Sequence, residues 1–211
     1  MAKDKEIGYI IEDKNNTFFV SDSHYHHFNI IESCGRPFKD ELEMNEVLIE
    51  NWNKVVPTDG LVFHLGDFAW GGYNKWKEIR DRLNGNIILI KGNHDWKNLT
   101  PTAEKELFDL TTQQMLIKIG ERSVYLNHFP FLCYGGTYRE PEKQVWALHG
   151  HVHLGQLSNG GRDLPRMKYL MPTQYDVGVD MNDFRPISWQ EVEDKINYQV
   201  KHNVNCTCWL S

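Results

Sequence analysis

Five short apolar runs, each stopped by turn-forming residues, constrain the fold of this chain most strongly. Each run is three to five residues long and is rich in β-branched or aromatic side chains. Runs of this kind are typical of buried strands that end in loops. The predicted strands are 18–20, 61–65, 87–90, 124–127 and 145–148.

Helical patterns fill the gaps between these runs. Apolar residues recur at spacings of 3 and 4 within 37–56 and again within 73–83, which predicts one apolar face on each helix. Two more helix starts are predicted, by a threonine before a proline at Thr100 and by a capping box from Ser188. Residues 115–126 have the pattern of a β-hairpin. Strands that alternate with helices indicate an α/β fold rather than an all-β barrel.

The composition is that of an ordinary globular protein. The chain has 211 residues, of which 40% are hydrophobic and 25% are charged. We predict a single domain over 1–211, with a core from about 17 to 200 and a polar C-terminal tail. Lys and Arg total 23 against 29 Asp and Glu, a formal net charge of -6. Because nucleic-acid binding surfaces are usually basic, we expect no stable binding to nucleic acid. The oligomeric state is left open.

Several further features bear on location. No run of about 18 apolar residues is present, so we expect no membrane span. The N-terminus, Met-Ala-Lys-Asp-Lys-Glu, mixes both charges, so we expect no signal peptide. The four cysteines form no C-x-x-C pair, which favours free thiols in a reducing, cytoplasmic setting.

Residues that can bind metal follow all five predicted strands. In open α/β sheets, ligand sites lie at the carboxyl ends of strands. Imidazole, carboxylate and amide groups without thiolate suit Mn best here, with Fe, Zn or Ni as alternatives. Seven ligands are too many for one tetrahedral ion, so we predict two divalent ions bridged by Asp67, an arrangement that serves displacement at phosphorus. The candidate ligands are Asp22, His24, Asp67, Asn93, His128, His151 and His153.

The order of these motifs resembles a known family, the calcineurin-like metallophosphoesterase superfamily. The resemblance rests on Asp22-x-His24, Gly66-Asp67, Gly92-Asn93-His94-Asp95, His128 and Gly150-His151-x-His153. Arg36-Pro37-Phe38 and Val177-Gly-Val-Asp180 are similar to its small, single-domain bacterial and phage branch. Tyr25-His26 departs from the branch, which has an aromatic residue and then Gly. The resemblance implies a four-layer sandwich, in which two mixed β-sheets lie face to face and are flanked by helices.

The resemblance also implies a division of roles among the ligands. The first metal would be held by Asp22, His24, Asp67 and His153, and the second by Asp67, Asn93, His128 and His151. A hydroxide that bridges the metals would attack phosphorus in line with the leaving oxygen. His94, which is left off the metals, is predicted to be the general acid, with transition-state stabilisation as a second role. Asp95 is predicted to be the partner that orients it, a helix N-cap, or both.

Other candidates near the motifs have competing interpretations. His27 is predicted to touch the substrate phosphate, and Arg36 either clamps a phosphate or forms a salt bridge to a helix. His64 and His149 lie inside strand runs and are predicted to be packed groups. The aromatic residues next to the motifs either wall the pocket or belong to the core; they are Tyr25, Phe68, Trp70 and Trp96.

These observations predict an enzyme that hydrolyses a phosphodiester or phosphomonoester, with a small nucleotide-like substrate. One alternative is a nuclease that acts on DNA or RNA, although no room remains for a nucleic-acid-binding domain. The other alternative is a non-catalytic protein-interaction scaffold of the same fold. That alternative would be indicated by loss of the ligands or of His94, and all of these residues are present.

Overall fold

Two five-stranded sheets are built from residues 9–140, 143–154 and 161–210, the part of the chain that this computed structural model describes. The first sheet has the strand order β10-β2-β3-β4-β5 and the second β1-β6-β7-β8-β9. The first contains β10 (Ile187–Ser188), β2 (Thr17–Val20), β3 (Leu61–His64), β4 (Asn86–Ile90) and β5 (Leu110–Thr112). The second contains β1 (Tyr9–Ile11), β6 (Gln114–Ile119), β7 (Arg122–Asn127), β8 (Trp146–His149) and β9 (Gln174–Asp176). The predicted hairpin is the antiparallel pair β6 and β7.

The central strands of the first sheet are apolar on both faces because each face meets a different layer. In β2, Phe19 joins the cluster that lies between the sheets, whereas Phe18 and Val20 join the cluster under the helices. Strand β4 alternates in the same way, with Ile88 facing the second sheet and Leu89 facing the helices. This double burial explains why these strands appear in the sequence as continuous apolar runs.

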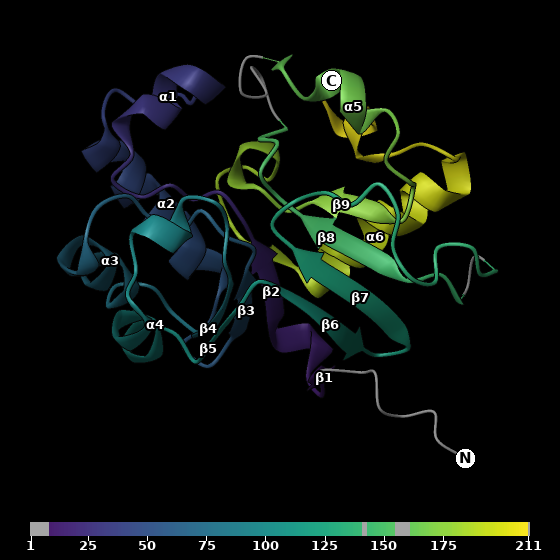
Figure 1. Cartoon of the computed structure of the whole chain (residues 1–211), viewed down its shortest axis with the longest axis horizontal. Helices are drawn as coiled ribbons and strands as arrows, with labels where there is room; N and C mark the ends of the chain where they lie inside the picture. The colour runs from purple at the N-terminus through teal and green to yellow at the C-terminus, as the bar shows by residue number, and fades with distance from the viewer. Residues whose placement is uncertain (1–8, 141–142, 155–160, 211) are drawn as a thin grey trace.

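The helices lie outside the sheets. In Figure 1, α1 to α4 gather beside the first sheet, and α6 lies beside the second, where it contacts β9 and also reaches β2. Their bounds are α1 Phe28–Cys34, α2 Glu41–Val55, α3 Tyr73–Arg80, α4 Pro101–Leu107, α5 Leu164–Met167 and α6 Trp189–His202. This confirms the α/β class with two mixed sheets and flanking helices. No helix in the described ranges has both the length and the apolar character needed to cross a membrane.

Capping side chains set the starts of α2, α4 and α6. The predicted starts at Thr100 and Ser188 are confirmed: Thr100 accepts from the Ala103 N–H, and Ser188 forms the complete capping box. The helix predicted over 37–56 begins later, at Glu41, because Asp40 caps it through the Glu43 N–H.

The predicted core boundaries are wrong at both ends. Strand β1, before residue 17, pairs in parallel with β6 and so extends the second sheet. Beyond residue 200, Cys206 is fully buried in the cluster between the sheets, and Trp209 packs against it, so the C-terminus is not a polar tail.

The four cysteines are free, as predicted. The segment used to argue against a signal peptide, 1–8, lies outside the described residues.

The carboxyl ends of the central strands meet at one edge of the molecule. Strands β2, β3 and β4 run parallel in the first sheet, and β7, β8 and β9 run parallel in the second. Hydrogen bonds from Ser21 N to Val177 O and from Val179 N to Ser21 O join the two sheets just after β2 and β9. The loops that follow six strands therefore converge on one place.

Candidate metal centre

Left-handed backbone turns carry most of the predicted ligands. Five of the seven have positive φ, between 48° and 72°. These residues are Asp22, His24, Asp67, His151 and His153. Non-glycine residues adopt this conformation at an energetic cost, which surrounding structure must offset. Close packing of the loops does so: a Cβ on Gly92 would collide with Asp67 Oδ1, and one on Gly150 would collide with Ser21 Oγ.

One group of ligand atoms is formed by Asp22, His24 and His153. His153 Nε2 lies 3.6 Å and His24 Nε2 lies 3.9 Å from Asp22 Oδ1. The other carboxylate oxygen of Asp22 accepts the His151 N–H at 2.8 Å, which fixes its orientation. All three side chains are buried. Their ligand atoms lie within 4.8 Å of one another, which is close enough to share one ion.

A second group is formed by Asp67, His128 and His151, whose ligand atoms also lie within 4.8 Å of one another. His128 Nε2 is 3.4 Å from Asp67 Oδ2 and 3.1 Å from Asn93 Oδ1. His128 Nδ1 is held by the Leu65 carbonyl at 2.7 Å, which leaves Nε2 to face the group. The sequence therefore identified residues that the fold brings together from both sheets.

Asp67 lies between the two groups. Its Oδ2 is 3.5 Å from His24 Nε2 in the first group and 3.4 Å from His128 Nε2 in the second. Ligands bound to one ion at about 2.0–2.2 Å lie about 3–3.5 Å apart. Asp67 Oδ1 accepts the His94 N–H at 2.9 Å, so the carboxylate is held in place from the opposite side.

Unpaired buried atoms and shifted pKa values show that cations fit here. Asp22 Oδ1 and His24 Nε2 are buried without a hydrogen-bond partner among the described residues, an uncommon state that an ion would relieve. Burial alone would lower the pKa of His128, but its bond to Asp67 and the charge of Asp22 raise it to about 9. The pKa of His153 is likewise raised against its burial, chiefly by Asp22 and Asp180. The carboxylates therefore favour positive charge at His128 and His153, whereas burial and neighbouring imidazoles lower the pKa of His24 and His151.

A cavity of about 160 Å³ opens over the two groups, and His94 and His27 lie on its wall. The His94 side chain is 35% exposed, and its Nε2 is 3.9 Å from Asp67 Oδ2. The His27 ring stacks on Trp70 at 4.6 Å, and its Nδ1 is 3.2 Å from His24 Nδ1. Of the four aromatic candidates, Tyr25 and Phe68 are buried in the core, whereas Trp70 and Trp96 are exposed. His64 and His149 are buried as predicted.

Asp95 does not orient His94 in the predicted way. Its carboxylate is fully buried and accepts the backbone N–H groups of Asp67, Phe68 and Gly92 at 2.8–2.9 Å. Both carboxylate oxygens of Asp95 therefore bind backbone N–H groups of the two loops that follow β3 and β4. Asp95 positions the Asp67 loop, and we correct its predicted catalytic role accordingly.

Of the two interpretations of Arg36, the phosphate clamp is wrong and the salt bridge is observed. It is 4% exposed, and its Nε and Nη2 each lie 2.8 Å from the carboxylate of Asp180, in the 3₁₀ helix η5 (Val179–Met181). The salt bridge to a helix, the alternative interpretation, is therefore the observed one. Asp180 in turn lies 2.8 Å from His153 Nδ1.

Sequence reasoning missed the role of Asp180, which links Arg36 to a candidate ligand. Carboxylates commonly fix metal-binding imidazoles through the ring nitrogen that does not bind the ion. Its signal was present in Val177-Gly-Val-Asp180, which was noted only as an element of the fold.

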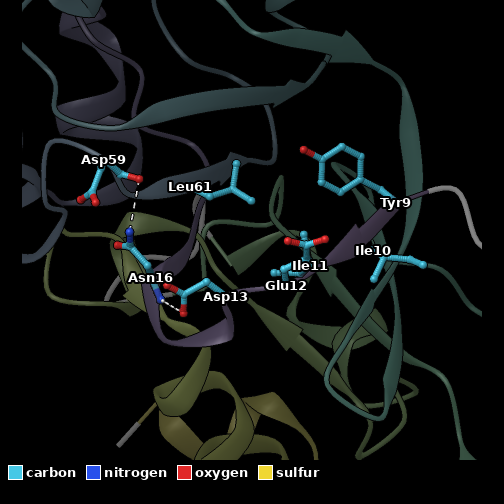
Figure 2. Close-up of a pocket in the computed structure, with 8 residues that line it drawn as sticks. All are labelled: Tyr9, Ile10, Ile11, Glu12, Asp13, Asn16, Asp59 and Leu61. Carbon is cyan, nitrogen blue, oxygen red and sulfur yellow. Dashed lines mark hydrogen bonds between the residues drawn. The ribbon is translucent and has the colours of Figure 1, made fainter.

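A second hollow, of about 300 Å³, offers no comparable chemistry (Figure 2). It includes Leu61, the first residue of β3, and so lies at the opposite end of this strand from Asp67. Its polar groups largely bind one another: Asp13 accepts the Asn16 N–H, and the Asn16 side chain donates to the Asp59 carbonyl. All three groups of ligand-type residues found in the described ranges instead include a candidate metal ligand; the third consists of Cys34, His153 and Asp180.

Comparison with known proteins shows what this chain is similar to. The family model of calcineurin-like phosphoesterases matches residues 16–200. The uncharacterized protein MJ1445 of Methanocaldococcus jannaschii is 30% identical over 81% of this chain and 85% of its own length. The gene 66 protein of Mycobacterium phage L5 is 28% identical over 87% of this chain and 95% of its own. The crystal structure of AQ665 from Aquifex aeolicus, a protein of unknown function, superposes with a TM-score of 0.63 at 28% identity, covering 84% of this chain and 97% of that one.

Proposed function

Because the chain belongs to the calcineurin-like phosphoesterase family, we propose that it hydrolyses a phosphoester with two divalent metal ions held at the strand ends. The single observation that carries this proposal is the position of Asp67 Oδ2, within 3.5 Å of both His24 Nε2 and His128 Nε2. A carboxylate so placed can bridge two ions. The first ion is assigned to Asp22, His24, Asp67 and His153, and the second to Asp67, Asn93, His128 and His151.

Manganese is the proposed metal, with Fe, Zn or Ni as alternatives, because the donors are imidazole, carboxylate and amide groups. Two divalent ions at such a site supply Lewis acidity toward phosphoryl oxygens and lower the pKa of bound water. Two carboxylates, Asp22 and Asp67, only partly neutralise that positive charge. A phosphate anion is therefore attracted to the cavity even though the chain carries a net charge of -6.

His94 is proposed to donate a proton to the leaving oxygen. Its side chain lies on the cavity wall and keeps 35% of its surface exposed, so a substrate can reach it. Its Nε2 lies 3.9 Å from Asp67 Oδ2, farther than His24 Nε2 at 3.5 Å and His128 Nε2 at 3.4 Å. General acid assistance of this kind typically contributes about 10²–10⁴-fold.

His27 is proposed to bind the substrate phosphate. If His24 binds metal through Nε2, its proton lies on Nδ1 and is donated to His27 Nδ1, 3.2 Å away. Neutral His27 then carries its own proton on Nε2, where it can donate to a phosphate oxygen. The stacking of Trp70 on the His27 ring holds that donor in place.

The substrate is proposed to be a small phosphodiester or phosphomonoester of nucleotide-like size, and the free cysteines support a reducing, cytoplasmic setting. The test is hydrolysis of bis-p-nitrophenyl phosphate and p-nitrophenyl phosphate by chelator-treated protein after addition of Mn, Ni, Zn or Mg. We expect at least one metal to restore turnover and Asp67→Asn to abolish it. Glu50→Gln, which breaks only the exposed Lys54–Glu50 ion pair, should retain it. Protein that takes up no metal and cleaves neither ester would instead be an interaction scaffold.

A further inference from the structure

An apolar pocket of about 400 Å³ lies next to the candidate metal centre. His151 lines both this pocket and the cavity over the metal groups, so the two spaces share a wall. The other side chains that matter for its shape are Phe129, Leu132, Met167, Tyr169 and Leu170. Its volume is within the range of pockets that hold small organic ligands.

Phe129 forms the wall of the apolar pocket nearest the metal centre. It directly follows His128, and its ring centroid lies 4.9 Å from that of His128 and 4.6 Å from that of His151. The ring is nevertheless 44% exposed. His128 and His151 therefore belong to the second group of candidate ligands, whereas the Phe129 ring beside them lines the apolar pocket.

The opposite side of the pocket has a buried base and a solvent-exposed opening. Met167 and Leu170 are 5% and 8% exposed and belong to the cluster between the sheets, so the floor is anchored in the core. Leu132 and Tyr169 are 73% and 64% exposed. Large apolar side chains exposed together around a hollow mark a binding surface more often than chance placement does.

Charge on the lining indicates what kind of group this pocket accepts. Arg166 is the one cationic residue in the described lining, and it pairs with Asp163 at 2.8 Å. That pair leaves no uncompensated cation to hold a second phosphate or a carboxylate. The remaining lining is aromatic or aliphatic.

We propose that the apolar pocket receives the organic group of the ester while the phosphoryl group lies at the metal centre, and that this group is a neutral, flat ring. The inference rests on the proposed function and names its substrate class. Leu132 and Tyr169 would then determine specificity by covering the ring, whereas His94 and His27 act on the phosphoryl group.

The test compares two probes that differ only in the organic group, phenylphosphonate and methylphosphonate. Their dissociation constants are measured by calorimetry on metal-loaded protein. We expect the phenyl compound to bind roughly tenfold to a hundredfold more tightly, because burial of the ring removes apolar surface from water. Leu132→Ala and Tyr169→Ala should each reduce that ratio severalfold and leave methylphosphonate binding unchanged. Tyr138→Ala is the matched control, since Tyr138 is 86% exposed and lies outside the pocket.

The outcomes separate this inference from the proposed function. If methylphosphonate binds but the ratio is close to one, or if the pocket variants keep the wild-type ratio, the metal centre stands and the ring-binding role is overturned. If neither phosphonate binds to metal-loaded protein, the proposed function fails and this inference fails with it. A ratio above ten that falls in both pocket variants and not in Tyr138→Ala establishes the pocket as the ring site.

Discussion

Asp180 connects the buried guanidinium of Arg36 to the candidate ligand His153. Replacing Asp180 with Asn would break this connection. The Asp180 carboxylate accepts two bonds from Arg36 and one from His153, each at 2.8 Å. Burial would raise the pKa of Asp180, but Arg36 and His153 hold it well below its usual range, so it is a carboxylate in the folded protein. Asparagine has one acceptor oxygen and no charge, so it cannot satisfy all three donors.

The expected loss of stability is large because the Arg36 side chain is completely buried. Removal of one partner of a buried ion pair typically costs about 3–5 kcal/mol. Arg36 would keep its bonds to the carbonyls of Asp22 and Ser23, so we expect a value near the lower end, about 3 kcal/mol. His153 would also lose the acceptor that orients it, and such losses typically lower metal affinity about 10–100-fold.

The free energy of unfolding is measured by urea denaturation of metal-free protein, and Mn²⁺ affinity by calorimetry. Asp163→Asn is the control, because the Asp163–Arg166 contact has the same 2.8 Å length but its Arg is 78% exposed. It should cost less than about 1 kcal/mol. The double variant Arg36→Met, Asp180→Asn removes the unpaired charge and should recover stability but not metal affinity. If Asp180→Asn binds Mn²⁺ as tightly as wild type and unfolds at the same urea concentration, the proposed positioning role is refuted.

Three further results are expected. Purified protein should hold close to two metal ions per chain by elemental analysis, and Asp67→Asn should lose more metal and turnover than Asp22→Asn; the reverse order would disprove the bridge. His94→Ala should keep both ions and lose about 10²–10⁴-fold on alkyl esters but less on nitrophenyl esters, and equal losses on both would argue for electrostatic stabilisation instead. Burial lowers the pKa of His64 to about 3, so its neutral form is required for folding, and the stability it confers is lost as pH falls below about 6.5. Between pH 6.5 and pH 5 this amounts to about 2 kcal/mol in metal-free protein, and urea denaturation of His64→Gln should show a correspondingly shallower loss.

The strands and the convergence of the seven candidate ligands were predictable because their signals are local. The runs that form buried strands such as β2 are apolar at successive residues. Each candidate ligand follows such a run within a few positions. The parallel order of β2, β3 and β4 then brings their ends together without further information. Local signals also predicted the helix starts at Thr100 and Ser188.

What escaped prediction depends on contacts between distant parts of the chain. Arg36 and Asp180 are 144 residues apart, and although both lie in segments that carry the family resemblance, no local pattern indicates that their side chains pair. Strand β1 is three residues long, and its partner β6 begins more than a hundred residues later. Asp95 has the sequence context of a helix cap, and only the packing of two loops turns its carboxylate toward their N–H groups. Burial, not sequence pattern, distinguishes a phosphate-binding Arg from a structural one.

The left-handed turns at the candidate metal ligands lower the stability of the metal-free fold. Strained backbone of this kind costs on the order of 1 kcal/mol per residue, and five of the seven candidate ligands carry it. Glycine at the same positions would adopt those dihedral angles freely and would also delete the ligand side chain. A laboratory selection for thermostability that is run in chelator would therefore enrich chains that have lost the centre, whereas one run with metal present would oppose them.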